Sequence, residues 1–492
     1  MLSIMYKKIL PYMLALAAMF ILSACGGGGE EITEEENGYD IDFVEPEPTS
    51  NIRTLSVTRP EFIMAETMLL EAVAHMRRQL EQEGMEFVLE TNVYSPEEQE
   101  AQLIRFQTMM MAGQSYDIFM FDHQPLWAYA RSGFLADIYE LIDQCPRVNR
   151  EDFYTNVLEA FEYDGRLISL PFFFGFRYVG INASLPQHFI DRFKGHSQIS
   201  MYELFQIYNE LQQDYWEDFG HMNLLNFIDP QYELQFAMGN YIDINTRSSS
   251  ITDDSFVSFL TAFRQVNDFG GFLITDMLRT PMDSRSDLSE FASAQAFYVP
   301  ISFYSPALAF IDTEDPYFVH HIPISGACGS LEMRRHDKYW IGNFSISASA
   351  DGSLALDFLM HLLSVQLERS TPSGGQYFAP LGTFSTPIFR PYVERHRTTV
   401  FRHTFTHIYD LVHHRVEGMA GLGPVERLEL ENQITENAIQ RLSGYNEMPI
   451  AIAPFVPITL YEGVMDGLLG GFITPEDAAQ QLQNSITLWL IE

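Results

Sequence analysis

The first third of the chain alternates short apolar runs with helical patterns, and this alternation restricts the fold more than any other feature. Strands are predicted at residues 54–57, 87–91 and 118–121, and helices at 61–83 and 95–111. Residues 127–143 are predicted to be mostly helical, and Asp164-Gly165 to form a turn. A turn of small residues, 112–115, separates the second helix from the third run. The order β-α-β-α-β predicts a parallel, doubly wound α/β sheet. Ligands of such sheets bind outside the carboxyl ends of the strands, which makes the loop after residue 121 the first place to look for a site.

The N-terminal 25 residues predict export and lipidation. Lys7 and Lys8 precede an apolar run, 9–22, that is too short to span a bilayer comfortably. The sequence Leu22-Ser23-Ala24-Cys25 is similar to a bacterial lipobox, in which the cysteine is lipidated and becomes the first mature residue. Residues 1–24 are therefore expected to be a lipoprotein signal peptide, and Cys25 to carry acyl chains such as palmitate that hold the protein at the extracytoplasmic face of the cell membrane.

The segment from 25 to 53 is predicted to be a disordered tether, because it is rich in glycine and acidic residues and has no base before residue 53. The whole chain has 66 acidic residues against 29 lysines and arginines, a formal net charge of −37. Such a negative field argues against nucleic acid or anionic lipid as a binding partner. The membrane is therefore expected to be contacted through the lipid anchor alone.

No metal site or cofactor is expected from the sequence. Beyond Cys25 the chain has two cysteines, Cys145 and Cys328, whose spacing does not indicate a disulfide. His403 and His407 are spaced i, i+4, with His414 nearby, but a solvated helical face explains this better than a metal. Nucleophile-elbow, P-loop and dinucleotide-binding motifs are absent from the sequence, so an enzyme is not expected.

Residues 172–182 form an apolar run that is long for a single small sheet. Its length fits a strand that crosses from one lobe to another. A second apolar run interrupted by glycine lies at 341–347, and further strands and helices are predicted between and after the two. Those helices are expected at residues 201–222, 251–270, 287–294, 354–365, 459–469 and 475–490, and a strand at 296–300.

Several motifs occur in an order that resembles the extracellular solute-binding proteins of ABC importers, family 1, the class that includes maltose- and oligosaccharide-binding proteins. These motifs are the lipobox, Ala112-Gly113 with Asp117-Ile118, Tyr129-Ala130 with Ser132-Gly133-Phe134-Leu135, Asp164-Gly165-Arg166 with Pro171, and Gly471-Phe472-Ile473-Thr474-Pro475-Glu476-Asp477-Ala478. The resemblance covers nearly all of the chain from Thr54.

The resemblance implies a periplasmic-binding-protein-like fold, in which two doubly wound α/β lobes are joined by a hinge of crossing strands. The two glycine-broken runs would be crossings, with Gly175, Gly180 and Gly342 allowing backbone rotation. The lobe boundaries expected on this basis are 54–177 with 345–385 for lobe I, and 178–344 with 386–492, including the C-terminal helices, for lobe II.

Sugar sites combine aromatic faces with planar polar groups that bind hydroxyls. Residues of these types at predicted strand ends and crossings are the candidates for solute binding: Arg59, Phe121, Asp122, His123, Trp127, Tyr178, Tyr298, Phe303 and Trp340. The alternatives are a solvated turn for Asp122 and His123, a surface salt bridge for Arg59, and core packing for the aromatic residues. No arginine follows Asp122, a departure from the charged pair of sugar-binding family members that leaves the solute open.

The resemblance implies a receptor that delivers a small polar solute, best fitted by an oligosaccharide, to the transmembrane subunits of an ABC permease. A binding protein for a peptide-like or other polar solute is the nearest alternative. A secreted carbohydrate-active hydrolase and an adhesion lipoprotein without a transport role are alternatives from other classes.

Overall fold

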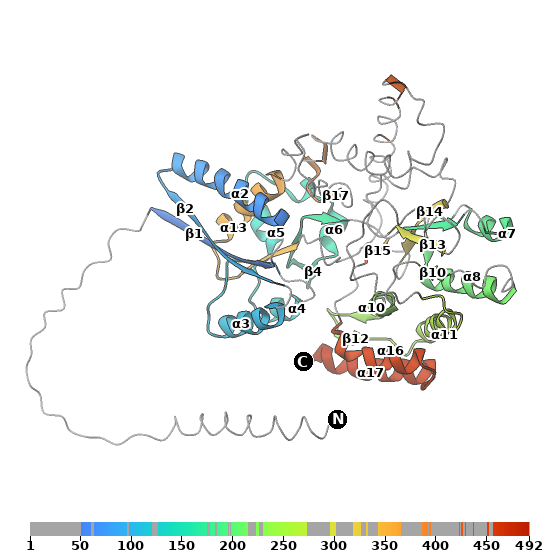
Figure 1. Cartoon of the computed structure of the whole chain (residues 1–492). Coiled ribbons are helices and arrows are strands. Elements are labelled where there is room, and N and C mark those ends of the chain that lie inside the picture. The colour runs from blue at the N-terminus through green and yellow to red at the C-terminus, as the bar shows by residue number, and fades with distance from the viewer. Residues whose placement is uncertain are drawn as a thin grey trace, which may run out of the picture. The chain divides into compact units, whose positions relative to one another are not determined.

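A computed structural model of the whole chain is shown in Figure 1. It describes residues 51–60, 63–95, 98–120, 126–174, 178–182, 185–194, 196, 198–214, 223–225, 230–272, 296–301, 318–325, 331–332, 343–365, 386–391, 393–394, 423, 425–426, 429, 436, 450–451 and 456–491. The predicted signal peptide, lipobox and tether, the histidines at 403, 407 and 414, and the predicted helix at 287–294 lie outside these residues. Within the described part, no helix combines the length and the apolar composition that crossing a membrane requires.

A five-stranded mixed sheet forms the centre of the first lobe, with strand order β2-β1-β3-β16-β6. Its strands are β1 (Ile52–Pro60), β2 (Glu86–Tyr94), β3 (Ile118–Phe119), β16 (Asn343–Ile346) and β6 (Leu170–Pro171). β1 pairs in parallel with both β2 and β3, while β16 is antiparallel to β3 and β6. The predicted α/β class is confirmed.

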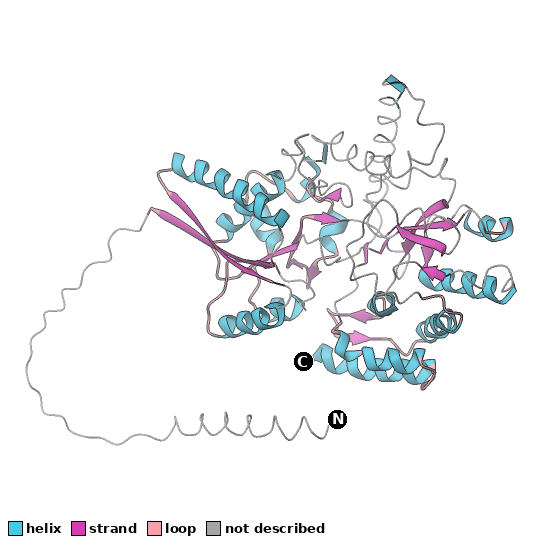
Figure 2. Cartoon of the chain, in the orientation of Figure 1, coloured by secondary structure: helices cyan, strands magenta, loops and turns pink. Residues whose placement is uncertain are grey.

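Helices cover both faces of this sheet (Figures 1 and 2). One face carries α2 (Ile63–Gln82), α5 (Ile138–Gln144) and α13 (Gly352–Val365), and the other carries α3 (Gln99–Met111) and α4 (Leu126–Arg131). Side chains alternate between the two faces along each strand: Ile118 lies in the core under α2 and α13, whereas Phe119 packs on the α3 side. This alternation is what a sheet buried on both faces requires.

The turn after α3 has the hydrogen bonds of a Schellman motif. Gln114 N donates to Met109 O (2.9 Å), and Gly113 N donates to Met110 O (2.9 Å). Gly113 has φ +73°, a conformation that glycine adopts without the Cβ clash of other residues. The predicted end of this helix at Met111 is therefore confirmed, and the glycine explains where it stops.

Two predicted boundaries in the first lobe are wrong. The first strand does not end before Thr58, because the β1–β2 ladder continues to the pair Pro60 with Tyr94. Proline is tolerated there because it is the last residue of the strand. The helix expected over 127–143 is also interrupted, since Gly133 adopts φ +75° and the Asp137 side chain accepts a hydrogen bond from Tyr139 N (2.9 Å), which caps a new helix, α5.

The predicted turn at Asp164-Gly165 connects the short strands β4 (Glu162–Tyr163) and β5 (Arg166–Leu167), which pair in antiparallel fashion. Both central residues have positive φ, 52° for Asp164 and 71° for Gly165. A two-residue loop with positive φ at both positions is a type I′ turn, in which aspartate and glycine are favoured.

A second sheet has the order β10-β13-β8-β14-β15-β18, with β9 paired to β14. Its strands are β8 (Tyr178–Asn182), β9 (Ile199–Ser200), β10 (Asn223–Leu225), β13 (Ala296–Ile301), β14 (Phe318–Ser325), β15 (Leu331–Glu332) and β18 (Ile450–Ala451). The core of this second lobe is contributed by β8 and the surrounding helices. These include α7 (Gln187–Ile190), α8 (Met201–Asp214), α10 (Pro230–Gly239), α11 (Asp254–Asp268), α16 (Glu462–Leu469) and α17 (Pro475–Ile491).

Most predicted elements of this lobe are confirmed, with shifted ends. α8 covers residues 201–214 of the helix predicted over 201–222, and the strand predicted at 296–300 is β13. The C-terminal pair of helices is present as α16 and α17, preceded by a short 3-10 turn, Ile458–Leu460. Thr474 caps α17, since its Oγ1 accepts a hydrogen bond from Asp477 N (3.1 Å).

The apolar run 172–182 contributes a strand to each lobe. Phe173–Phe174 forms β7, which pairs with β17 (Thr386–Pro387), and Tyr178–Asn182 forms β8 in the second sheet. Residues 386–393 were expected in the second lobe, but Ile388 and Val393 are buried in the core of the first. The physical reason is that the β7–β17 pairing and the apolar side chains that follow it hold this segment against the first lobe.

Candidate functional site

Five strand ends meet at one edge of the first sheet. Because β1, β2 and β3 are parallel, their carboxyl ends at Pro60, Tyr94 and Phe119 lie together. β16 is antiparallel to β3 and β6, so it begins at this edge with Asn343, where β6 ends with Pro171. We call this the carboxyl edge of the first sheet, the position at which open α/β sheets bind ligands.

The chain passes from this edge to the corresponding edge of the second sheet. It leaves the first sheet after Pro171 and enters the second at Tyr178. Tyr178 is opposite Ile301, the last residue of β13, and opposite Pro323, near the end of β14. The first crossing segment therefore joins the carboxyl edges of both sheets, as a ligand site between two lobes requires.

Asp117, a residue of the resemblance motif, has a structural role within the first sheet. Its Oδ2 accepts hydrogen bonds from the backbone N and the Oγ of Ser56 (both 2.7 Å), and its own N donates to Ser56 Oγ (3.0 Å). Its carbonyl accepts from Ser347 N (2.9 Å). Asp117 thereby fixes β3 between β1 and the end of β16, which sets the register of the strands at the carboxyl edge.

Arg59 lies at the end of β1 with 4% of its surface exposed. This burial contradicts the alternative of a surface salt bridge. Beside it Thr58 is also buried and its Oγ1 accepts a hydrogen bond from Asn92 Nδ2 (3.0 Å). A buried guanidinium needs acceptors for its five N–H groups, which makes Arg59 a charged hydrogen-bond donor at the carboxyl edge.

Asn343 is a candidate that the sequence analysis missed. It begins β16 at the carboxyl edge, opposite Pro171, and is 6% exposed. Its side-chain amide makes no hydrogen bond to the described part of the chain, although it could donate and accept. The sequence signal that could have identified Asn343 was a polar residue in an apolar run, directly after Gly342.

Trp127 is buried in a cluster on the α3–α4 face, with 5% of its surface exposed. We call this the aromatic cluster; its buried members are Tyr94, Phe106, Met110, Phe119, Leu126, Trp127, Tyr129, Ala130, Leu135, Tyr163 and Ile168. Burial raises the pKa of Tyr129, against the opposing effect of its hydrogen bond with Gln107 (3.1 Å). The structure thus gives Trp127 a packing role, the alternative considered for it, and its part in solute binding stays a prediction.

The remaining candidates are only partly placed. Tyr178 and Tyr298 are located by their backbones, Tyr178 at the start of β8 and Tyr298 within β13 opposite Ile181. Phe121, Asp122, His123, Phe303 and Trp340 lie outside the described residues. In sequence, residues 121–123 directly follow Met120, next to the carboxyl end of β3. Trp340 lies three positions before β16, which begins at the carboxyl edge. The strands next to these candidates therefore have one end at that edge.

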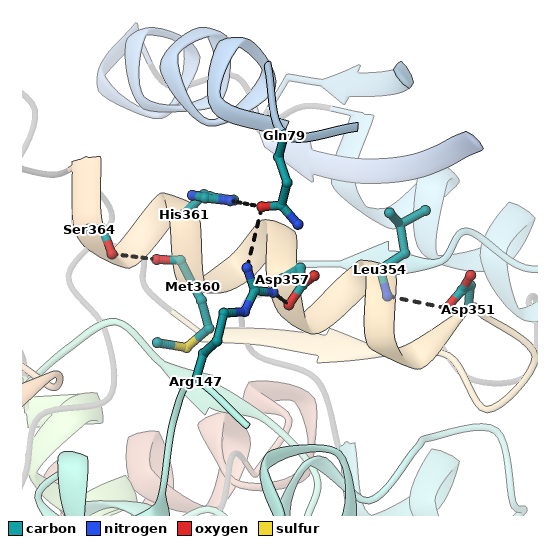
Figure 3. A network of polar contacts seen from close by, with 8 residues as sticks. All are labelled: Gln79, Arg147, Asp351, Leu354, Asp357, Met360, His361 and Ser364. Atoms are coloured by element: carbon teal, nitrogen blue, oxygen red, sulfur yellow. Dashed lines mark hydrogen bonds and ion pairs between the residues drawn. The ribbon is translucent and has the colours of Figure 1, made fainter. Parts of the chain in front are cut away.

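A polar seam between α2 and α13 forms a cluster of titratable groups in the described part of the first lobe (Figure 3). The His75 and His361 rings stack with centroids 5.4 Å apart, and His361 Nε2 lies 3.0 Å from Gln79 Oε1. Gln79 Oε1 also accepts from Arg147 Nη1 (3.3 Å), and Arg147 pairs with Asp357. Burial, with the nearby charges of His75, Arg147 and Arg78, lowers the pKa of His361 to about 4.

This seam does not have the donors of a metal centre. Within the described part of the chain there is no group of three histidine, cysteine or carboxylate ligands able to hold an ion. Cys145 is a half-buried free thiol. The cation of the seam is Arg147 itself, which contacts both Gln79 and Asp357.

A cavity of about 290 Å³ opens between α8 and α11 of the second lobe. Neutral amide and hydroxyl groups line most of it, and they bond to one another or to the helices: Asn209 Nδ2 donates to Gln265 Oε1 (3.2 Å), and Thr261 Oγ1 to Val257 O (2.9 Å). Its lining comes from two helices and from none of the strand ends. We therefore place the candidate site at the carboxyl edges.

Comparison with known proteins finds similarity in structure but not in sequence. No family model matches the sequence, and no curated protein matches it. An oligogalacturonide-binding protein from Yersinia enterocolitica aligns with 89% of this chain and 99% of its own at a TM-score of 0.54 and 12% identity. A family 1 extracellular solute-binding protein from Alicyclobacillus acidocaldarius aligns with 90% of this chain and 100% of its own at a TM-score of 0.50 and 11% identity.

A third match is a protein from Synechococcus sp. MITs9220 that is assigned as an oligosaccharide periplasmic-binding protein. It covers 89% of this chain and 99% of its own, with a TM-score of 0.53 and 11% identity. The fold is that of the periplasmic binding proteins. The predicted architecture of two α/β lobes joined by crossing strands is thereby confirmed, while identities this low carry no further conclusion.

Proposed function

We propose that this protein is an extracytoplasmic, lipid-anchored receptor of the family 1 solute-binding type that captures an oligosaccharide and delivers it to an ABC permease. The observation that carries the proposal is the meeting of strand ends and crossing segments at the carboxyl edges of both sheets. This arrangement gives a ligand simultaneous access to two lobes that are linked by short segments. The oligosaccharide-binding proteins with the same fold support the choice of solute.

A neutral oligosaccharide fits the described chemistry better than a charged one. The net charge of −37 opposes an acidic sugar. Asn343 offers both a donor and an acceptor to a hydroxyl, and the predicted aromatic residues Tyr178 and Trp340 would stack on the sugar rings. We assign Arg59, Asn343 and the predicted residues 121–123 to one wall of the site.

Lipidation at Cys25 and the acidic tether 25–53 are part of the same proposal. They would hold the receptor at the membrane, where a permease could collect the solute. Contacts that form only when both lobes touch the solute would distinguish the loaded receptor from the empty one. We keep the lobe boundary at 177/178 and propose that residues 343–393 belong to the first lobe.

A thermal-shift screen tests the proposal. The purified protein is heated with neutral oligosaccharides, acidic oligosaccharides and short peptides, and the sugars are then analysed for cleavage. We expect stabilisation by a neutral oligosaccharide without turnover. Cleaved product would favour the carbohydrate-active hydrolase, stabilisation by a peptide alone would favour the peptide-like solute, and no stabilisation by any compound would favour an adhesion role.

Asn343→Ala provides the matched test of the site. Loss of two hydrogen bonds to a hydroxyl should weaken binding of the identified sugar by about tenfold. Asn92→Ala is the control, because the Asn92 amide already donates to Thr58 Oγ1 (3.0 Å) and Gln102 Oε1 (3.2 Å). Equal affinities of the Asn343→Ala variant and the unmodified protein, measured by calorimetry, would remove Asn343 from the site.

A further inference from the structure

Two tryptophans from different lobes are in contact. The Trp127 and Trp489 rings have centroids 5.5 Å apart and planes at 89°, an edge-to-face arrangement. The guanidinium of Arg131 lies 5.3 Å from the Trp127 ring centroid. Edge-to-face aromatic pairs and cations over indole rings are both attractive contacts.

Each tryptophan is held by its own lobe. Trp127 belongs to α4 and is buried in the aromatic cluster on the first sheet. Trp489 belongs to α17, whose side chains Leu482, Ile486 and Leu490 are buried in the core of the second lobe. Gln483 fixes α17 further, because its Oε1 accepts from Ile251 N (2.8 Å) and its Nε2 donates to Ser249 Oγ (2.7 Å).

A polar contact and a second apolar side chain accompany the tryptophan pair. Asp164 N, in the β4–β5 turn, donates to Asn245 Oδ1 (3.0 Å) in the turn between β11 (Ile242–Asp243) and β12 (Ser248–Ser249). Asp243 Oδ1 holds that turn by accepting from Asn245 N (2.8 Å) and Thr246 N (3.0 Å). Ile244 and Trp489 are partly buried against both the aromatic cluster and the core of the second lobe.

The contact belongs to a cluster that reaches the carboxyl edge of the first sheet, where we place the solute. The aromatic cluster includes Tyr94, the last residue of β2, and Phe119, the last residue of β3, and the Tyr94 hydroxyl donates to Met120 O (2.9 Å). α4 begins six residues after Met120. Movement of the lobes away from each other at this edge would separate Trp127 from Trp489.

We infer that Trp127 and Trp489 are positioning residues that hold the two lobes together at the carboxyl edge and thereby raise the affinity for solute. Their effect on affinity rests on the proposed function, because it assumes that the solute contacts both lobes. The apparent affinity of a binding site falls in proportion to the fraction of molecules in the competent form. A contact that favours the form with the lobes together increases that fraction before any solute arrives.

Trp489→Ala in the purified full chain tests the inference. We expect a larger radius of gyration in solution scattering without solute. The affinity for the sugar identified by thermal shift should be roughly two- to tenfold weaker, the range that an aromatic pair supplies. Trp489→Phe keeps an aromatic edge and should restore most of both properties. Leu488→Ala is the control, since Leu488 is the neighbouring α17 residue and is 57% exposed.

The two proposals fail in different ways. If Trp489→Ala has a larger radius but the unmodified protein binds no sugar, the role of the tryptophan contact is supported and the proposed function is contradicted. An unchanged radius and affinity in a folded Trp489→Ala protein would overturn the inference while the receptor role stands. If Trp489→Ala does not fold, Asn245→Ala decides the question, because it removes the polar contact between the same two lobes. An unchanged radius for that variant would equally overturn the inference.

Discussion

The two faces of the first sheet differ in what they contact. The face under α2 and α13 is closed by a polar seam of His75, Gln79, Arg147, Asp357 and His361, and all of these belong to the first lobe. The face under α3 and α4 carries the aromatic cluster, which also receives Ile244 and Trp489 from the second lobe. The first face therefore stabilises one lobe, whereas the second can also influence how the lobes are arranged.

Two large-to-small substitutions compare the faces directly. Phe358 of α13 and Phe106 of α3 are both almost fully buried, and each ring packs near another, Phe87 and Phe119 respectively. Replacing either by alanine should lower the free energy of unfolding by about 3–5 kcal/mol, measured by chemical denaturation. Under native conditions only Phe106→Ala should also enlarge the radius of gyration, because it loosens the cluster that Trp489 contacts.

A larger radius for both variants, or for Phe358→Ala alone, would contradict this assignment of the two faces. In that case the first face would also control the arrangement of the lobes.

Asp117→Ala should have an intermediate effect, because it acts on the sheet between the two faces. It removes two hydrogen bonds to a carboxylate and leaves the Ser56 N–H without its acceptor. We expect a loss of about 2 kcal/mol in the free energy of unfolding. Arg53→Ala is the control on the same strand, where an exposed ion pair with Asp351 (3.0 Å) should contribute about 0.5 kcal/mol or less. Equal losses for the two variants would show that Asp117 does not organise the sheet.

The smallest expected effect is a pH dependence of the free energy of unfolding, caused by His361 on the α2–α13 face. The pKa of His361 is about 4 in the folded protein and about 6.5 in an unfolded chain, so the imidazole is neutral in both above that pH. As the pH falls from 6.5 towards 4, the unfolded state gains a proton that the folded state does not, and stability is lost. We expect a loss of about 1 kcal/mol, reduced from the full value because His361 is partly exposed.

Denaturation at pH 7.5 and pH 5 measures this loss. His361→Gln should remove most of the difference between the two pH values, and His75→Gln should remove a smaller part because the neighbouring charge is one of several causes. In the aromatic cluster, the shifted group is Tyr129, whose raised pKa keeps it neutral in this range. A pH dependence unchanged in His361→Gln would assign the loss to other groups.

The first lobe could be predicted from the sequence because its signals are local. Apolar runs of four to five residues, the Ala112-Gly113 turn and the Asp164-Gly165 turn each determine backbone conformation within a few residues. Gly133 and Asp137 carried equally local signals for a break between α4 and α5, and the apolar periodicity around them concealed that break.

Long-range packing could not be predicted in the same way. The pairing of β7 with β17 joins residues more than 200 positions apart, so nothing in the local pattern near Ile388 indicates that it belongs to the first core. The burial of Trp127 against Trp489 is of the same kind. In the candidate site, residue type and position at predicted strand ends were enough to select the aromatic and polar candidates. Asn343 was found only in the structure, because strand pairing places it at the carboxyl edge.

We propose that the two lobes close on a solute bound between their carboxyl edges. Solution scattering of the purified protein, with and without the oligosaccharide that gives the largest thermal shift, would detect this closure. We expect a smaller radius of gyration on addition of the sugar, with no change in the sugar itself. A stabilising sugar that leaves the radius unchanged would contradict it.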